Sequence, residues 1–179
     1  MTVTVTPKLG ATDQWTVIAT PVGEMMVIGD DDAVHFVHLP DSFVRSAFDP
    51  ERIGLPTAVA GAVEQINAYF TGALKEFSLP LDPAGTVFQR QVWLALADIG
   101  YGETESYGEL ASRVGNPKAC RAVGLANGRN PIPLVLPCHR VIGANGSLTG
   151  YGGGLELKQR LLDHERSAST ASSTRRRAS

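Results

Sequence analysis

The chain has 179 residues, of which 43% are hydrophobic and 19% charged, a composition typical of a globular protein and unlike that of a disordered one. Its apolar runs, such as residues 132–137, are far too short to span a bilayer, so we expect no contact with a membrane. Two cysteines cannot build a disulfide framework or a cysteine-rich zinc site, and we expect neither a metal nor a cofactor. The first ten residues lack the basic start and apolar block of a secretory signal, so we expect a cytoplasmic protein.

The net charge of −2 hides an asymmetry along the chain. The first 80 residues carry 4 basic and 10 acidic side chains, and the remaining residues carry 12 basic and 8 acidic ones. No acidic residue occurs between Glu109 and Glu156, but five basic residues do: Arg113, Lys118, Arg121, Arg129 and Arg140. An acid-free basic segment indicates an anionic partner, with nucleic acid the first candidate, although on charge alone a solvated basic face fits equally well.

The first part of the chain, residues 1–80, predicts a small acidic α/β domain. Residues 14–20, 25–28 and 33–39 have the alternation and the separating turns of three strands, which we expect to form a small antiparallel sheet. Three adjacent aspartates, residues 30–32, lie in the last turn, where we expect a solvated turn rather than a metal site. Residues 57–72 show apolar residues at helical spacing, and the Pro-rich segment 79–83 separates this domain from the next.

The second part, residues 81–166, predicts a mostly α domain. Thr86 is a candidate N-cap for a helix that reaches residue 99. Two short helices, residues 106–114 and 118–126, are joined by a turn at residues 115–117 and outline a helix-turn-helix. The second of these helices would carry Lys118 and Arg121, so that charge and topology agree on DNA binding. A last helix covers residues 155–165, and residues 167–179 predict a disordered basic tail.

Cys138, between Pro137 and His139, is the candidate nucleophile. A thiol with a pKa of about 8.5 is mostly protonated at neutral pH, so it needs a base or a positive field in order to react. Adjacent residues in an extended segment point apart, so His139 can act on Cys138 only if the backbone turns or a water bridges them. Taken alone, a buried structural cysteine beside a histidine is the commoner situation.

The segment PCHRVIG, residues 137–143, resembles the active-site signature of the methylated-DNA–protein-cysteine methyltransferases, the O6-alkylguanine-DNA alkyltransferases. Further segments resemble this family in the same order and with its spacing: residues 88–93, 101–104, 106–111, 121–124, 127–131 and 148–154. The first domain resembles the family only in its size and its order of strands and helix.

The resemblance implies direct reversal of DNA damage. Cys138 would take the alkyl group from O6-alkylguanine in double-stranded DNA, with O4-alkylthymine as a further candidate, and each chain would react once. His139, oriented by Glu165, would accept the thiol proton through a water. Tyr107 would donate a hydrogen bond to the departing purine, and Asn130 would tie the recognition helix to the active-site loop.

The resemblance also implies how DNA is held. The second helix of the helix-turn-helix would enter the minor groove, and Arg121 would fill the space left by the flipped-out base. Ala122 and Ala126 would allow close approach to the DNA backbone, with Lys118 and Arg129 adding positive charge. The substrate pocket would be lined by three residues of the glycine-rich segment: Tyr151, Gly152 and Gly153.

The sequence departs from the family pattern at two of these positions. Leu125 stands where many members have glycine, and Gly152 stands where some have serine. Two other classes of protein compete with the methyltransferase. A DNA-lesion-binding relative would lack the acceptor cysteine, and a cysteine hydrolase would need a separate facing histidine, which does not stand out. We expect a monomer, and we expect Cys120 to be a small core residue that the reaction does not need.

Overall fold

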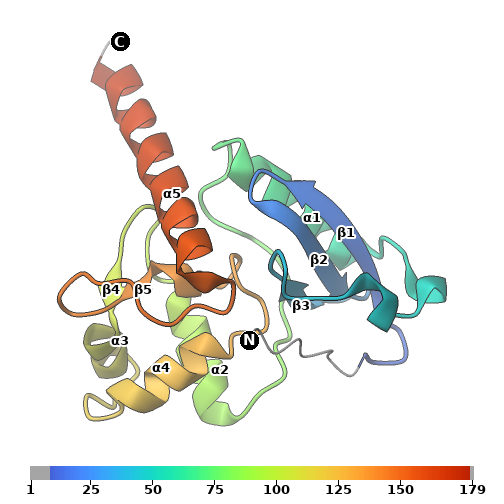
Figure 1. Ribbon diagram of the computed structural model, residues 1–179, viewed down its shortest axis with the longest axis horizontal. Helices are drawn as coiled ribbons and strands as arrows, with labels where there is room; N and C mark the ends of the chain where they lie inside the picture. The colour runs from blue at the N-terminus through green and yellow to red at the C-terminus, as the bar shows by residue number, and fades with distance from the viewer. Residues whose placement is uncertain (1–8, 178–179) are drawn as a thin grey trace. The chain divides into compact units, whose positions relative to one another are not determined.

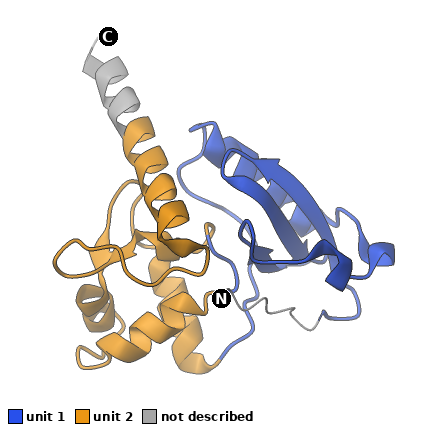
Figure 2. Ribbon diagram, in the orientation of Figure 1, with its two compact units in different colours: residues 1–85, 131–133 blue, residues 86–130, 134–179 orange. Residues whose placement is uncertain are grey.

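The computed structural model describes residues 9–177, with side chains described as far as residue 168. Two compact units form: residues up to Gly85 with Pro131–Pro133 make unit 1, and residues 86–130 with those from Leu134 onwards make unit 2 (Figure 2). The expected boundary after residue 80 lies in the connector that ends unit 1, and the expectation did not include the short segment 131–133. Among the described residues, no helix combines the length and the apolar character needed to cross a membrane.

Unit 1 is a three-stranded antiparallel sheet with one helix (Figure 1). Strands β1 (Gln14–Thr20), β2 (Gly23–Gly29) and β3 (Val34–His38) pair in chain order, followed by the 3-10 turns η1 (Arg45–Ala47) and η2 (Pro50–Arg52). Helix α1 (Thr57–Phe70) packs against β1 and β2. Residues 25–29 of the central strand are all buried, because one face meets α1 and the other meets an aromatic cluster.

The aromatic cluster of unit 1 contains a buried histidine. Trp15 and Phe48 pack with Met26 and Ile28, and the ring of His38 lies 5.7 Å from the ring of Phe48, between ring centroids. His38 is 4% exposed, and its Nε2 has no hydrogen-bond partner among the described residues. Burial lowers the pKa of His38 to about 4, because the charged form would lose its hydration.

Unit 2 is built around three helices that pack on one another, α2 (Val87–Leu96), α3 (Tyr107–Arg113) and α4 (Cys120–Gly128). Capping boxes begin the first two: the Thr86 side chain accepts from Gln89 N–H, and the Ser106 side chain accepts from Glu109 N–H. Gly115 has φ +79°, which turns the chain sharply between α3 and α4. The Trp93 indole N–H donates to the Ala126 carbonyl at 2.7 Å and joins α2 to α4. The predicted fold class, including the helix-turn-helix, is confirmed.

Several element boundaries differ from the predictions. Helix α4 begins at Cys120, so Lys118 lies in the turn before it, and Cys120 is exposed rather than part of the core. Two-residue strands, β4 (Glu105–Ser106) and β5 (Val141–Ile142), form a parallel pair that the sequence pattern did not indicate.

The last helix is longer than predicted. Helix α5 (Gly154–Arg177) continues past residue 165, in place of the disordered tail expected from residue 167. The physical reason is that no glycine or proline interrupts residues 155–177, and alanine and arginine both favour helix. Residues 178 and 179 of the expected tail lie outside the described residues.

Unit 1 is expected to lose stability in mild acid. His38 stays neutral in the folded unit but takes up a proton after unfolding, so stability falls as the pH drops from about 6.5 to about 4. The slope contributed by this group reaches at most about 1.4 kcal/mol per pH unit. His38→Gln should remove this component. Urea unfolding at several pH values, followed by Trp15 fluorescence in a Trp93→Phe background, measures how the unfolding free energy changes with pH. Equal slopes with and without His38 would contradict the prediction.

Candidate active site

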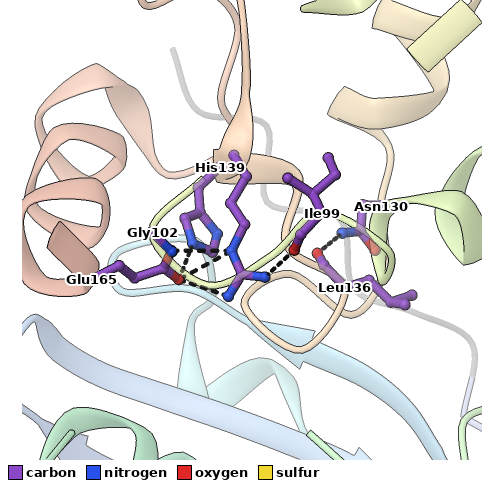
Figure 3. Close-up of polar contacts among 7 residues, drawn as sticks. Ile99, Gly102, Asn130, Leu136, His139 and Glu165 are labelled. Carbon is purple, nitrogen blue, oxygen red and sulfur yellow. Dashed lines mark hydrogen bonds and ion pairs between the residues drawn. The ribbon is translucent and has the colours of Figure 1, made fainter. Parts of the chain in front are cut away.

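Cys138 lies in a buried loop that is held by two asparagines. It begins the 3-10 turn η3 (Cys138–Arg140), residues 134–141 are all buried, and Cys138 itself is 4% exposed. The Leu136 carbonyl accepts from Cys138 N–H at 2.7 Å. The same carbonyl accepts from Asn130 Nδ2 at 2.6 Å (Figure 3). Asn127, on α4, donates from Nδ2 to the Cys138 carbonyl at 3.3 Å. The loop is therefore fixed from α4 and from the residues that follow it.

A buried carboxylate gathers the polar groups behind this loop (Figure 3). Glu165 Oε1 lies 2.9 Å from His139 Nε2 and accepts from Arg140 Nη2 at 2.9 Å, while Oε2 accepts from Gly102 N–H at 2.9 Å. The remaining Arg140 nitrogen, Nη1, donates to the Ile99 carbonyl at 2.5 Å. Burial by itself raises the pKa of Glu165, but the hydrogen bonds and charges of His139 and Arg140 outweigh it and lower the pKa to about 2. The carboxylate is therefore ionised at neutral pH.

The charge of Glu165 is balanced by Arg140, so His139 can stay neutral. Burial lowers the pKa of His139, against the opposing effect of the Glu165 carboxylate. Because the ionised carboxylate accepts at Nε2, the ring proton belongs on that nitrogen. Nδ1, which has no hydrogen-bond partner among the described residues, is then left as a basic lone pair. This is the state that a general base requires.

The thiol is protonated in the resting site. Burial raises the pKa of Cys138 to about 11, although a hydrogen bond from Asn130 and the charge of Lys158 act in the opposite direction. A thiol of this kind reacts only when a base removes its proton. Adjacent side chains of an extended segment point apart, but Cys138 and His139 lie in the η3 turn, where the backbone is not extended.

Lys158 is a residue of this site that the sequence analysis missed. It is fully buried, and its ammonium donates to the carbonyls of Val141 at 2.6 Å and Thr149 at 2.9 Å. The same nitrogen lies 5.9 Å from the ring centroid of Tyr107 and 6.0 Å from that of Tyr151. Burial lowers the pKa of Lys158 to about 8. Helical spacing was the available signal, since this lysine shares a buried face of α5 with Leu161, Leu162 and Glu165.

The predicted tyrosines lie beside this lysine. Tyr107 is the first residue of α3, and its hydroxyl donates to the Thr149 carbonyl at 3.0 Å. The hydroxyl of Tyr151 is buried, and burial raises the pKa of Tyr151 well above its usual value. Gly152 faces open space, and Gly153 follows it in the loop that enters α5. Of the predicted pocket residues, Tyr151 thus lies beside Lys158, a cation that the prediction did not include.

The outward face of α4 carries part of the predicted DNA surface. Arg121, Ala122 and Leu125 are exposed, as are Lys118 before the helix and Arg129 after it. Ala126 is not at this surface, because it lies one turn after Val123 on the packed face and is 3% exposed.

Two arginines of the basic segment are also unavailable to an external anion. Arg140 is the buried partner of Glu165, and Arg113 pairs with Asp98 at 2.8 Å and with Glu105 at 2.5 Å. The basic segment therefore presents three exposed cations with no ion pair among the described residues: Lys118, Arg121 and Arg129.

Comparison with protein families matches both halves of the chain. Residues 87–167 match the model of the 6-O-methylguanine DNA methyltransferase DNA-binding domain, and residues 14–83 match that of the ribonuclease-like domain of the same proteins. A methylated-DNA–protein-cysteine methyltransferase of Mycolicibacterium paratuberculosis is 52% identical over 164 residues, which cover 90% of this chain and 97% of the relative. One from Methanosarcina acetivorans is 47% identical over 161 residues, 84% of this chain and 97% of that one.

Solved structures agree with the sequence comparison. The O6-methylguanine methyltransferase of Mycobacterium tuberculosis superposes with a TM-score of 0.78 at 47% identity, covering 88% of this chain and 94% of that one. The crystal structure of the OGT of the same organism in complex with DNA gives a TM-score of 0.78 at 48% identity, over 87% and 94% of the two chains. The resemblance seen in the second domain is confirmed, and it extends to the first domain, where the sequence motifs had not revealed it.

Loss of the buried carboxylate is expected to destabilise unit 2. Glu165→Gln leaves the Arg140 guanidinium buried without its counter-charge, which costs about 3–5 kcal/mol of unfolding free energy. The matched control is Glu156→Gln, an exposed residue of the same helix, for which we expect a change within about 0.5 kcal/mol. Urea unfolding compares the two variants, and equal effects would argue against a buried ion pair.

Proposed function

Because the chain belongs to the methylated-DNA–protein-cysteine methyltransferase family, we propose that Cys138 takes the alkyl group of O6-alkylguanine directly from double-stranded DNA. The proposal rests on one arrangement, a buried thiol followed in the chain by a buried histidine whose free Nδ1 is set by the Glu165 carboxylate. The product is S-alkylcysteine and an unmodified guanine. A thioether is a very poor leaving group, so each chain reacts once and the protein acts as a stoichiometric repair enzyme.

In the transfer, His139 Nδ1 accepts the Cys138 proton through a water molecule, and the resulting thiolate attacks the alkyl carbon. The bond between this carbon and the guanine oxygen breaks, and its electron pair stays on the purine. Tyr107 turns its hydroxyl from the Thr149 carbonyl to the purine and stabilises the developing negative charge. The Glu165 carboxylate stabilises the imidazolium that forms. The imidazolium proton then passes through water to the purine anion, so that neutral guanine leaves and His139 is neutral again. Since the resting thiol has a raised pKa, it stays unreactive until this proton transfer occurs.

Asn130 is assigned to hold the reactive loop, since its side chain bonds the Leu136 carbonyl and lowers the pKa of the Cys138 thiol. Lys158 joins the assignment, because its charge also lowers the pKa of that thiol. Tyr151, Gly152 and Gly153 are assigned to the wall of the base pocket. The open space at Gly152 supports this role, because it leaves room for the alkyl group.

Double-stranded DNA is the partner, bound through α4. A guanine inside a duplex cannot bring its O6 substituent to a buried thiol, so the nucleotide must be flipped out of the stack. Arg121 is proposed to fill the vacated space in the minor groove and Ala122 to allow close approach, while Lys118 and Arg129 meet phosphates. The exposure of all four side chains supports these roles. Ala126, being buried, is not assigned one.

The proposal includes a cytoplasmic protein that acts as a monomer. Both cysteines are free thiols, and an acceptor thiol has to stay reduced until it meets its substrate. Nothing in this reaction calls for a second copy of the chain, since the proposed acid–base groups all belong to unit 2.

Transfer to Cys138 is expected to be stoichiometric and irreversible. A duplex oligonucleotide carrying O6-methylguanine with a labelled methyl group should transfer at most one label per chain to the wild-type protein and none to Cys138→Ser. Cys120→Ser is the matched control and should transfer as the wild type does, because Cys120 is an exposed residue outside the site. Binding of the oligonucleotide without transfer of label would instead indicate a lesion-binding protein.

Arg121→Ala is expected to slow repair of duplex DNA far more than reaction with a free base. Base flipping costs a few kcal/mol, so losing the group that fills the vacated space should reduce the duplex rate about tenfold to a hundredfold. The rate with free O6-benzylguanine should change less than about twofold, because no flipping is needed. Lys118→Ala, the neighbouring exposed cation, should weaken DNA binding and leave the rate at saturating DNA unchanged. Equal losses of Arg121→Ala in both assays would remove its role in flipping.

A further inference from the structure

Asn127 is a buried polar residue that the proposed mechanism does not yet use. It is 2% exposed and lies on the packed face of α4 beside Ala126, among apolar neighbours. Its Nδ2 donates to the Cys138 carbonyl at 3.3 Å, and its Oδ1 has no hydrogen-bond partner among the described residues. Because a buried polar atom without a partner is costly, an asparagine here needs a reason that packing alone does not supply.

Tyr107 lies along the same face of α4. A Cβ placed on Gly124 would lie 3.7 Å from Cδ1 of the Tyr107 ring, so the ring rests directly on the helix at this glycine. Asn127 is three residues further along α4, on the same side of the helix. Burial raises the pKa of Tyr107, and the Asn127 side chain acts in the opposite direction, which agrees with an amide close to the phenol. The Asn127 amide therefore lies between the Cys138 loop and the Tyr107 hydroxyl.

The chemistry of the amide fits these two neighbours. A carboxamide NH₂ group has two hydrogens: one is donated to the Cys138 carbonyl, and the second is available to the nearby Tyr107 oxygen. The carbonyl can only accept, which fixes the orientation of the amide. A hydroxyl that accepts one hydrogen bond becomes a stronger donor of its own proton, because hydrogen bonds in a chain polarise one another. Asn127 thus strengthens the donor that faces the departing purine.

We propose that Asn127 is a positioning residue of the transfer reaction, which acts through Tyr107 by holding its hydroxyl at a fixed place relative to the Cys138 loop. This inference rests on the proposed function. It connects α4, the helix proposed to bind DNA, directly to the residues of the transfer reaction. One side chain on the inner face of α4 then positions both the loop that carries the attacking sulfur and the hydroxyl that donates to the leaving group.

The test is a double-mutant cycle on the rate of methyl transfer from O6-methylguanine DNA in a single turnover. Asn127→Leu keeps the branching of the side chain and removes both donors, so it should slow transfer about tenfold, the effect of one lost hydrogen bond to a developing charge. In a Tyr107→Phe background the same change should slow transfer about threefold or less, because only the bond to the Cys138 carbonyl is then lost. A full tenfold loss in that background, or no loss in the Tyr107-containing protein, would overturn the proposal.

Two further variants separate positioning from a loss of structure. Val123→Ala weakens the packing of the same buried face of α4 without touching a hydrogen bond, and its transfer rate should stay within about twofold of the wild-type rate. Asn127→Asp keeps the shape and places a negative charge beside the thiol, so the pH–rate profile should move to higher pH. An unmoved profile would contradict contact with the site. Transfer by the wild-type protein tests the proposed function separately, so failure of the Asn127 proposal leaves that function intact.

Discussion

The arrangement of unit 2 depends on one buried carboxylate. Taking Glu165 out of water is unfavourable unless its charge is balanced and its oxygens are hydrogen-bonded. Arg140 supplies the balancing charge, while His139 and the Gly102 backbone supply further contacts. These partners come from the reactive loop and from the chain before α3, so the carboxylate fixes both against α5. The same constraint makes His139 available as a base, since its ring is neutral and its Nδ1 is left free.

The charged groups on the two sides of the thiol act differently. The opposite charges of Glu165 and Arg140 cancel, and the Glu165 carboxylate orients the His139 ring. On the tyrosine side of the site, Lys158 adds a positive charge that forms no ion pair among the described residues. Burial nevertheless raises the pKa of Cys138 to about 11, so the thiol stays protonated in the resting protein. In the proposed reaction each chain reacts once, so an acceptor that stays protonated until substrate arrives is an advantage.

The two faces of helix α4 have different surroundings. Its outer face presents Arg121, Ala122 and Leu125 to solvent, and its inner face presents Val123, Ala126 and Asn127 to the core and to the reactive loop. Because both faces belong to one rigid element of nine residues, a DNA contact on the outside and the position of the thiol inside are not independent.

Local sequence determined the elements and the reactive motif of this protein. The three strands, the caps at Thr86 and Ser106, the turn at Gly115 and the Cys138 segment all depend on neighbours within a few residues, so their patterns could be recognised. Contacts between distant residues decided the rest. By sequence Arg140 is one of five basic residues of an acid-free segment, but the fold pairs it with Glu165. The role of Lys158 depends on the carbonyls that the fold brings to its ammonium. The pairing of β4 with β5 joins two-residue strands that are too short for any periodicity to be detected. The role of a charged residue depends on the partner that the tertiary structure places beside it. Burial and pairing, and not residue type, determine the pKa of such a group and its contribution to stability.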